Sequence, residues 1–369
     1  MILLSSIIEK FEGRFLDKYK TAILPSHKKA LQAMKMCRKE HGPHLLAQCA
    51  NIECLQQTYI PHSCGNRNCP HCQNHEGRQW IENQLNKQLP VKYFLITFTL
   101  PEQLRDITWK NQKLIYSLFF ICVKETLQTF TKNDKRLQGT AGFTAVLQTH
   151  SRRGDYHPHI HVVMPAGSIN KKTRSWRVKD GKYLFNHKAL AEVFRAKLLK
   201  MMVDNNLQIP KKCPETWVVD CKCVGNGNKA IIYLGNYLYK GVIQEKNILK
   251  CEKGMVTFRY VHSKSKEVKT RTVTGECFLW LLMQHVLPKG FRRARVYGFL
   301  HPCSKQLIKL LQYLLKINPV KFFKQLKKRA EIICKCCGAK MKVIGVMIPS
   351  YQVHAAANST YLKGGLFVM

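Results

Sequence analysis

Apolar and polar positions alternate along the chain with periods that predict helices and strands in turn. Residues 1–36 place apolar side chains three to four apart, which predicts helices, and helices are likewise predicted over 79–88, 114–130, 184–202, 229–242 and 275–286. Runs rich in β-branched and aromatic residues predict strands over 91–100, 143–150, 157–164, 217–223, 255–262 and 268–273. A turn over 151–156 joins two of these strands. The interleaving of strands and helices indicates an α+β or α/β core.

Composition divides the chain into three regions. Residues 1–90 are helical at both ends and dense in Cys and His between 37 and 72. Residues 91–249 hold most of the alternating strands and helices. Residues 250–369 are basic, and within 288–342 there are 15 Lys or Arg against a single acid, Glu331. We predict an N-terminal domain over 1–90, a core domain over 91–249 and a basic C-terminal region over 250–369.

The charge of the chain indicates a polyanionic partner. The sequence has 61 Lys and Arg against 22 Asp and Glu, which gives a formal net charge of +39. Self-repulsion of this size disfavours an isolated protein and favours nucleic acid binding. The scarcity of acids argues against mechanisms that need several carboxylates around metal ions, including that of a carboxylate-triad transposase.

The sequence predicts a cytoplasmic protein that does not enter a membrane. Its first residues lack the leading positive charges and the small-residue cleavage site of a signal peptide. No run reaches the ~20 apolar residues that a membrane-spanning helix needs. In a reducing compartment, 16 cysteines indicate metal ligation more than disulfides.

The segment 37–72 has the composition of a zinc site. Zinc takes four thiolate or imidazole ligands, usually from short loops with two to four residues between ligands. Cys69-Pro-His-Cys72 is such a loop, and Cys49 with Cys54 is a slightly wider one. Near the C-terminus, Cys334-x-x-Cys337-Gly is half a zinc knuckle. The candidate ligands are Cys37, His44, Cys49, Cys54, Cys64, Cys69, Cys72, Cys334 and Cys337. The pairing among them is not readable from spacing, and a structural role is favoured over a catalytic one.

A second metal site is predicted on the strand that contains His157-Pro-His-Ile-His161. Alternate side chains of a strand share a face, so His159 and His161 project together, roughly 6–7 Å apart along the backbone. Two imidazoles at this spacing can hold one divalent cation, which would polarise a phosphodiester. His157 faces the same way, while Gln148 and His150 on the preceding strand are rival third ligands.

Two tyrosines supply a candidate nucleophile. Tyr233 and Tyr237 are four residues apart in Ile-Ile-Tyr-Leu-Gly-Asn-Tyr-Leu-Tyr-Lys, so on a helix they share one face, about 6 Å apart. A tyrosine that attacks phosphorus forms a covalent phosphotyrosine and conserves the bond energy for rejoining. Lys240 could neutralise phosphate close by.

With these pieces in place, the chain resembles the rolling-circle transposases of the two-tyrosine HUH superfamily, in the insertion-sequence-ninety-one-like group. The similar motifs are the Cys/His segment that ends in Cys69-Pro-His-Cys72, Phe98-Thr-Leu-Pro101, His157-Pro-His-Ile-His161, Tyr233-Leu-Gly-Asn-Tyr237 and the segment from His285 to His301. The chain departs from the family pattern at Asn68, in the Cys49–Cys54 spacing and at Tyr239.

The resemblance implies a fold, a reaction and partners. It implies an α+β HUH endonuclease core, an antiparallel sheet flanked by helices, with an N-terminal zinc-binding domain and a basic C-terminal region. Tyr233 and Tyr237 would cleave and rejoin single-stranded DNA with Mg²⁺ or Mn²⁺ on His159 and His161, leaving a 5′-phosphotyrosine and a free 3′-OH. Zn²⁺ would be structural. Further candidate DNA contacts are Arg292, Arg293 and Arg295. A homo-oligomer stays open.

Two other functions fit part of the pattern. A plasmid replication initiator or a mobilisation relaxase would share the histidine strand and a tyrosine, but the zinc-rich N-terminus and the Tyr-x-x-x-Tyr pair favour the transposase. A zinc-dependent DNA-binding protein without catalysis would not need His159, His161, Tyr233 and Tyr237 together. The sequence therefore predicts a bacterial, DNA-associated enzyme.

Overall fold

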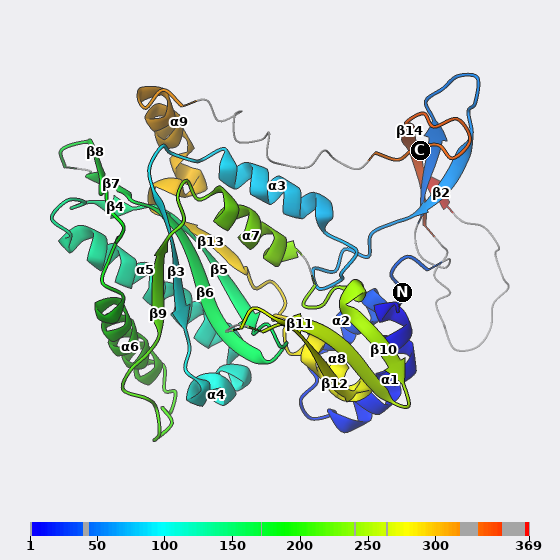
Figure 1. Cartoon of the computed structure of the whole chain (residues 1–369), viewed down its shortest axis with the longest axis horizontal. Helices are drawn as coiled ribbons and strands as arrows, with labels where there is room; N and C mark the ends of the chain where they lie inside the picture. Colours follow the sequence, from blue (N-terminus) through cyan, green and yellow to red (C-terminus); the bar gives the residue numbers. More distant parts are fainter. Residues whose placement is uncertain are drawn as a thin grey trace.

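The centre of the molecule is a five-stranded antiparallel sheet (Figure 1). The computed structural model describes residues 2–39, 44–170, 172–239, 241–262, 265–317, 331–348 and 366–368. The order of the strands in the sheet is β13-β5-β6-β3-β9. Their bounds are Ala294–Tyr297 (β13), Phe143–His150 (β5), Tyr156–Pro165 (β6), Tyr93–Thr99 (β3) and Val219–Cys223 (β9). The sheet thus joins segments from three distant parts of the chain.

Helices cover both faces of this sheet (Figure 1). On one face lie α5 (Gln112–Asn133) and α6 (His187–Asp204), together with the short α4 (Arg105–Lys110) near the end of β6. They bury alternate strand residues such as Phe94, Ile96 and Phe98 in the largest core. Helix α6 begins where the side chain of Asn186 accepts hydrogen bonds from two backbone N–H groups. The other face carries α7 (Asn228–Tyr239), which packs on α3 (Asn74–Leu85).

A second core joins the N-terminal helices to a segment more than 200 residues later. Helices α1 (Leu4–Lys18) and α2 (Pro25–Lys35) pack with α8 (Gly275–Met283) and with the sheet β10-β11-β12. The strands are β10 (Ile248–Glu252), β11 (Met255–Val261) and β12 (Val268–Thr274). Gly275 allows this packing, since a Cβ there would lie 2.3 Å from the ring of Phe11.

Two smaller sheets complete the structure. One has the order β15-β14-β1-β2, with bounds His44–Cys49 (β1), Gln57–Pro61 (β2), Met341–Ile348 (β14) and Leu366–Val368 (β15). The other has the order β4-β7-β8, with bounds Thr140–Ala141, Gly167–Asn170 and Ser175–Val178. Helix α9 (Lys305–Leu314) follows β13 along the chain. Short 3-10 turns cover Glu102–Leu104, Glu245–Asn247, Gly298–Leu300 and Pro302–Ser304.

The expected mixture of helices and antiparallel strands is present, and each predicted element range overlaps a helix or strand. The elements that were not predicted are the strands β1, β2, β4, β7, β8, β10, β13, β14 and β15 and the helices α4 and α9. The hydrophobic cores also cross the expected boundaries at residues 90 and 250, because α1 and α2 share a core with α8, and β13 pairs with β5. None of the helices in the described residues combines the length and the apolar character that a membrane crossing requires.

Candidate functional site

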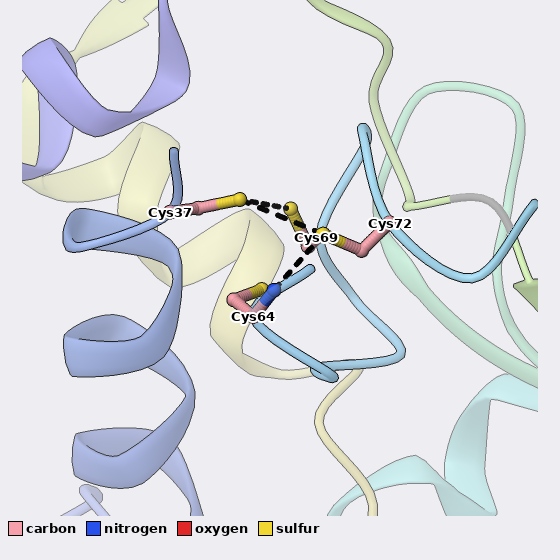
Figure 2. A group of neighbouring side chains, drawn as sticks. All are labelled: Cys37, Cys64, Cys69 and Cys72. Carbon is pink, nitrogen blue, oxygen red and sulfur yellow. Dashed lines mark hydrogen bonds between the residues drawn. The ribbon is translucent and has the colours of Figure 1, made fainter. Parts of the chain in front are cut away.

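Four cysteines meet between the end of α2 and the start of α3. Cys37 follows α2, and Cys64, Cys69 and Cys72 lie in the loop before α3 (Figure 2). The Sγ atom of Cys37 is 3.5 Å from the Sγ atoms of both Cys69 and Cys72, and all four sulfurs lie within 4.8 Å of one another. The group borders the second core, in which Cys69 and Cys72 are buried.

A second group combines cysteines from opposite ends of the chain. Cys49 and Cys54 flank the end of β1, and β14, which pairs with β1, begins just after Cys334 and Cys337. The Sγ–Sγ distances are 3.4 Å for Cys49–Cys337 and 3.8 Å for Cys54–Cys334. His44 belongs to neither group, because it begins β1 at the far end of the strand from Cys49.

The geometry of both groups fits zinc. A tetrahedron of thiolates with Zn–S bonds of about 2.3 Å has S–S edges of about 3.8 Å. The Sγ–Sγ distances within the two groups, 3.4 to 3.8 Å for the contacting pairs, lie close to this value. Within the part of the chain that the structure describes, each group contains four thiols and no other ligand type, which is typical of closed structural sites.

The histidine pair lies on the α7 side of the central sheet. His159 and His161 have ring centroids 4.9 Å apart on β6. The hydroxyl of Thr97, on β3 directly opposite His161, is 2.8 Å from Nδ1 of that imidazole. Gln148, on β5 directly opposite His159, places its Oε1 atom 3.0 Å from Nε2 of His159. Burial lowers the pKa of His159 to about 3 and that of His161 to about 4, so both imidazoles are neutral and offer lone pairs.

The contacts of His159 leave lone pairs facing each other. Its Nδ1 atom lies 2.7 Å from the carbonyl oxygen of His157 and is therefore the protonated nitrogen. Nε2 then carries a lone pair, yet it faces the Oε1 atom of Gln148, while Nε2 of Gln148 is buried without a partner. Neighbouring ligands of an octahedral ion, with bonds of about 2.1 Å, lie about 3.0 Å apart. With the amide of Gln148 in this orientation, Nε2 of His159 and Oε1 of Gln148 are spaced as two ligands of a divalent cation, and the ring of His161 lies beside them.

The other two histidine candidates lie beside this pair but have other partners: the ring centroid of His157 is 5.3 Å from that of His159, and burial together with the charges of His159 and His157 lowers the pKa of His150. Nδ1 of His157 lies 3.0 Å from the guanidinium of Arg105. The register of β5 against β6 shifts between Gln148 and His150, so that His150 lies opposite Tyr156 instead of His157. His150 instead places its Nδ1 atom 3.2 Å from the hydroxyl of Tyr237.

The two tyrosines of α7 lie in different surroundings. Gly235 faces α3, where a Cβ would lie 2.2 Å from Ile81, so the helix packs closely through this position. Tyr233 is 51% exposed and its ring centroid lies 6.1 Å from that of His161. Tyr237 is partly buried, and burial of its phenol raises the pKa to about 12.

Tyr233 opens into a pocket of about 390 Å³ beside the central sheet. Residues of the β5–β6 turn, including Arg152, form one wall, and residues of β11, including Arg259, form another. The pocket therefore brings together an exposed phenol, two guanidinium groups and the end of the strand that carries Gln148 and His150.

Tyr237 borders a cluster that the sequence analysis did not identify. The Arg293 guanidinium carbon lies 6.0 Å from the centre of the Tyr237 ring, and Arg293 itself is 7% exposed. His285 is buried beside His150, with ring centroids 5.2 Å apart, and it bonds to Thr149 and to the carbonyl of Gly154. The sequence alone does not show that Arg293 is buried while Arg292 beside it is exposed. This difference becomes visible only once β13 is paired with β5.

The other DNA-contact candidates lie in a basic groove of about 790 Å³ along the β13 edge of the sheet. Lys113, Lys289, Arg292 and Arg295 line it, and the described lining residues include no Asp or Glu. Arg295 is held by stacking, with its guanidinium carbon 4.3 Å from the centre of the Phe120 ring. Lys240 lies outside the described residues.

Comparisons with known proteins point in one direction. Residues 142–307 match the family described as "Putative transposase", and residues 7–100 match the "Transposase zinc-binding domain". "Putative transposase y4qJ" of Sinorhizobium fredii is 30% identical over 305 residues, which cover 76% of this chain and 76% of that protein. The "Transposase for insertion sequence element IS801" of Pseudomonas savastanoi is 24% identical over 342 residues, which cover 84% and 82%. No solved structure matches the chain at a significant level.

Proposed function

We propose that this chain, which belongs to the transposase family with an insertion-sequence-ninety-one-like zinc-binding domain, nicks and rejoins single-stranded DNA at the ends of its element. The observation that carries this proposal is the placement of Tyr233, exposed in a pocket, 6.1 Å from the ring of His161. The reaction would take place on DNA in the bacterial cytoplasm, and the core would be that of an HUH endonuclease.

The proposed reaction is a transesterification. The Oη atom of Tyr233 attacks a phosphorus atom of the DNA strand, the Oη–P bond forms, and the bond from phosphorus to the 3′ oxygen breaks. The phenol gives up its proton, the leaving oxygen takes one up as a free 3′-OH, and the 5′-phosphate stays on the tyrosine. Arg152 and Arg259, which line the same pocket, would neutralise the phosphates on either side of the cleaved bond.

Mg²⁺ or Mn²⁺ would be held by His159, His161 and Gln148, since Nε2 of His159 and Oε1 of Gln148 are spaced as two ligands of such an ion. When bound, the cation would polarise the phosphodiester and stabilise the charge on the leaving oxygen. Thr97 keeps the ring of His161 in place, and the His157 carbonyl does the same for His159.

The two cysteine groups would each hold one structural zinc ion. Cys37, Cys64, Cys69 and Cys72 would fasten the loop before α3 to the second core, and Cys49, Cys54, Cys334 and Cys337 would fasten β14 to β1. A structural role is consistent with the absence of any non-cysteine ligand from either group.

The proposal is tested by trapping the covalent intermediate. Single-stranded oligonucleotides from the DNA that flanks the gene are incubated with the protein and Mn²⁺, and denaturing gels are examined for a protein–DNA adduct. We expect an adduct that requires the metal and disappears when Tyr233→Phe and Tyr237→Phe are combined, because both proposed nucleophiles are then removed. DNA affinity should be nearly unchanged in this variant. Cleavage that persists in it would contradict the proposal.

A separate prediction concerns the basic groove. Combining Lys289→Gln with Arg292→Gln removes two exposed cations from the groove lining. Since each phosphate contact contributes about 0.7 to the salt dependence of single-strand binding, the slope of log K against log salt should fall by about 1.4. Fluorescence anisotropy at several salt concentrations measures it. An unchanged slope would place the DNA elsewhere. Lys172→Gln combined with Arg174→Gln, two exposed cations of the β7–β8 turn, is the charge-matched control.

A further inference from the structure

We propose that Arg293 and Arg67 form a phosphate subsite beside Tyr237, which holds the 5′-phosphate that Tyr237 takes at the second element end. This inference rests on the proposed function. It gives Tyr237 its own pair of phosphate-binding cations, distinct from the arginines that line the pocket of Tyr233. It also gives the first cysteine group a part in the reaction, because Arg67 lies in the loop between Cys64 and Cys69.

Among the residues that the structure describes, Arg293 is a buried cation without an anionic partner. Burial lowers the pKa of its guanidinium, and the ionisable groups close enough to shift that pKa further are Tyr237, Arg67 and Tyr116, none of which is a carboxylate. Its Nε atom has no hydrogen-bond partner, and one terminal nitrogen donates to the carbonyl of His285 at 3.3 Å. Burying an unpaired charge is costly, so a protein that retains one has a use for an anion at that place.

The nearby carboxylate is already committed. Asp155, whose charge acts on His285, accepts a hydrogen bond of 2.7 Å from Arg271 and also pairs with Arg153. Tyr237 does not supply the anion in the resting protein either, since burial keeps its phenol protonated. The negative charge that matches Arg293 must therefore arrive with the substrate.

Arg67 approaches the same place from the solvent side. Arg67 is exposed and donates a long hydrogen bond of 3.4 Å to the carbonyl of Phe291. Because both side chains are cations, the charge of Arg67 lowers the pKa of Arg293 further. Two guanidinium groups from different segments that lie close enough to repel each other are a common arrangement for phosphate. Tyr237 lies against this pair through the contact between its ring and Arg293.

The subsite would act in one step of the reaction. The Oη atom of Tyr237 attacks the phosphorus at the second element end, the Oη–P bond forms, and the bond to the 3′ oxygen breaks. The phenolic proton is lost and the leaving oxygen becomes a hydroxyl, so no further reactant is needed. Arg293 and Arg67 would bind the non-bridging oxygens, on which charge increases in the transition state.

The test uses the full chain and a single-stranded oligonucleotide that carries both element ends. The first adduct and the joined product are measured on the same gel. With Arg293→Gln we expect the first adduct to stay within about twofold of wild type, while the joined product falls about 100-fold, as for loss of one transition-state donor. Arg293→Lys should recover part of the loss because it keeps the charge. Arg67→Gln should lower the joined product about tenfold.

Two further variants separate this role from a structural one. In the Tyr237→Phe background, where only the first adduct can form, Arg293→Gln should leave that adduct within about twofold, since Arg293 acts only in the step of Tyr237, whereas a structural role would lower it. Arg174→Gln, which also removes one guanidinium, should behave as wild type.

The inference is overturned if the joined product is unaffected by Arg293→Gln, if both products fall together, or if Arg293→Lys is no better than Arg293→Gln. A wild-type protein that forms neither product overturns the proposed function and this inference with it. A wild-type protein that forms both, alongside an unimpaired Arg293→Gln variant, overturns this inference alone.

Discussion

Replacing Tyr233 with Phe is expected to abolish the first covalent adduct with single-stranded DNA, whereas replacing Tyr237 with Phe is expected to leave it. Tyr233 is 51% exposed in a pocket and its ring lies 6.1 Å from that of His161. Tyr237 is partly buried, its hydroxyl is bonded to His150, and its pKa is raised to about 12. Loss of the nucleophile should lower the adduct by about a thousandfold or more.

The measurement is the amount of adduct formed with labelled oligonucleotide and Mn²⁺ in a denaturing gel. Tyr239→Phe is the matched control, because Tyr239 lies on the same helix but contacts Gly77 of α3. An adduct that survives Tyr233→Phe and is lost with Tyr237→Phe would contradict this order of action. It would mean that the buried phenol, and not the exposed one, meets the DNA first.

Much of the fold follows from local patterns in the sequence. The run over 91–100 contains β3 (Tyr93–Thr99), and the helix expected over 114–130 lies within α5 (Gln112–Asn133). These elements were predictable because the apolar residues of each repeat with the period of a strand or of a helix over its whole length. Strand β13 (Ala294–Tyr297) was not, since it is short, contains an arginine and is completed only by pairing with β5, about 150 residues earlier.

The candidate site was likewise predictable only where it depends on local sequence. That His159 and His161 share a face follows from the period of a strand, and the structure places them together. The choice between Gln148 and His150 as their neighbour depends on a shift of register, which leaves no mark in composition. The pairing of Cys49 with Cys337 was likewise unreadable, because 288 residues separate them and only the β1–β14 pairing brings them together.

The zinc groups are expected to differ in what they contribute to stability. Cys69 and Cys72 are 1% and 3% exposed and belong to the core formed by α1, α2, α8 and β10–β12. The second group includes the exposed Cys337 and fastens β14 to β1, in a small sheet of which no described residue belongs to the hydrophobic cores around the helices. Loss of a ligand from the group that contains Cys69 should therefore disturb the large core, whereas loss of a ligand from the group that contains Cys337 should disturb only the small sheet.

Cys69→Ser is accordingly expected to lower the zinc content from two ions per chain to one and the unfolding midpoint by about 10 °C or more. Structural zinc binds with an apparent free energy of about 10–16 kcal/mol, as large as the whole stability of a typical domain at about 5–15 kcal/mol. Cys337→Ser should lose one zinc ion as well, but with a midpoint within about 3 °C of wild type. Metal analysis and thermal unfolding by circular dichroism measure both.

Cys336→Ser is the matched control for the second group, because Cys336 is an exposed neighbour that lies outside it. It should keep both zinc ions and the wild-type midpoint. Equal losses of stability in Cys69→Ser and Cys337→Ser would contradict the distinction between the groups. The two sites would then stabilise one cooperative unit, and fastening β14 to β1 would matter as much to the fold as closing the loop beside α2.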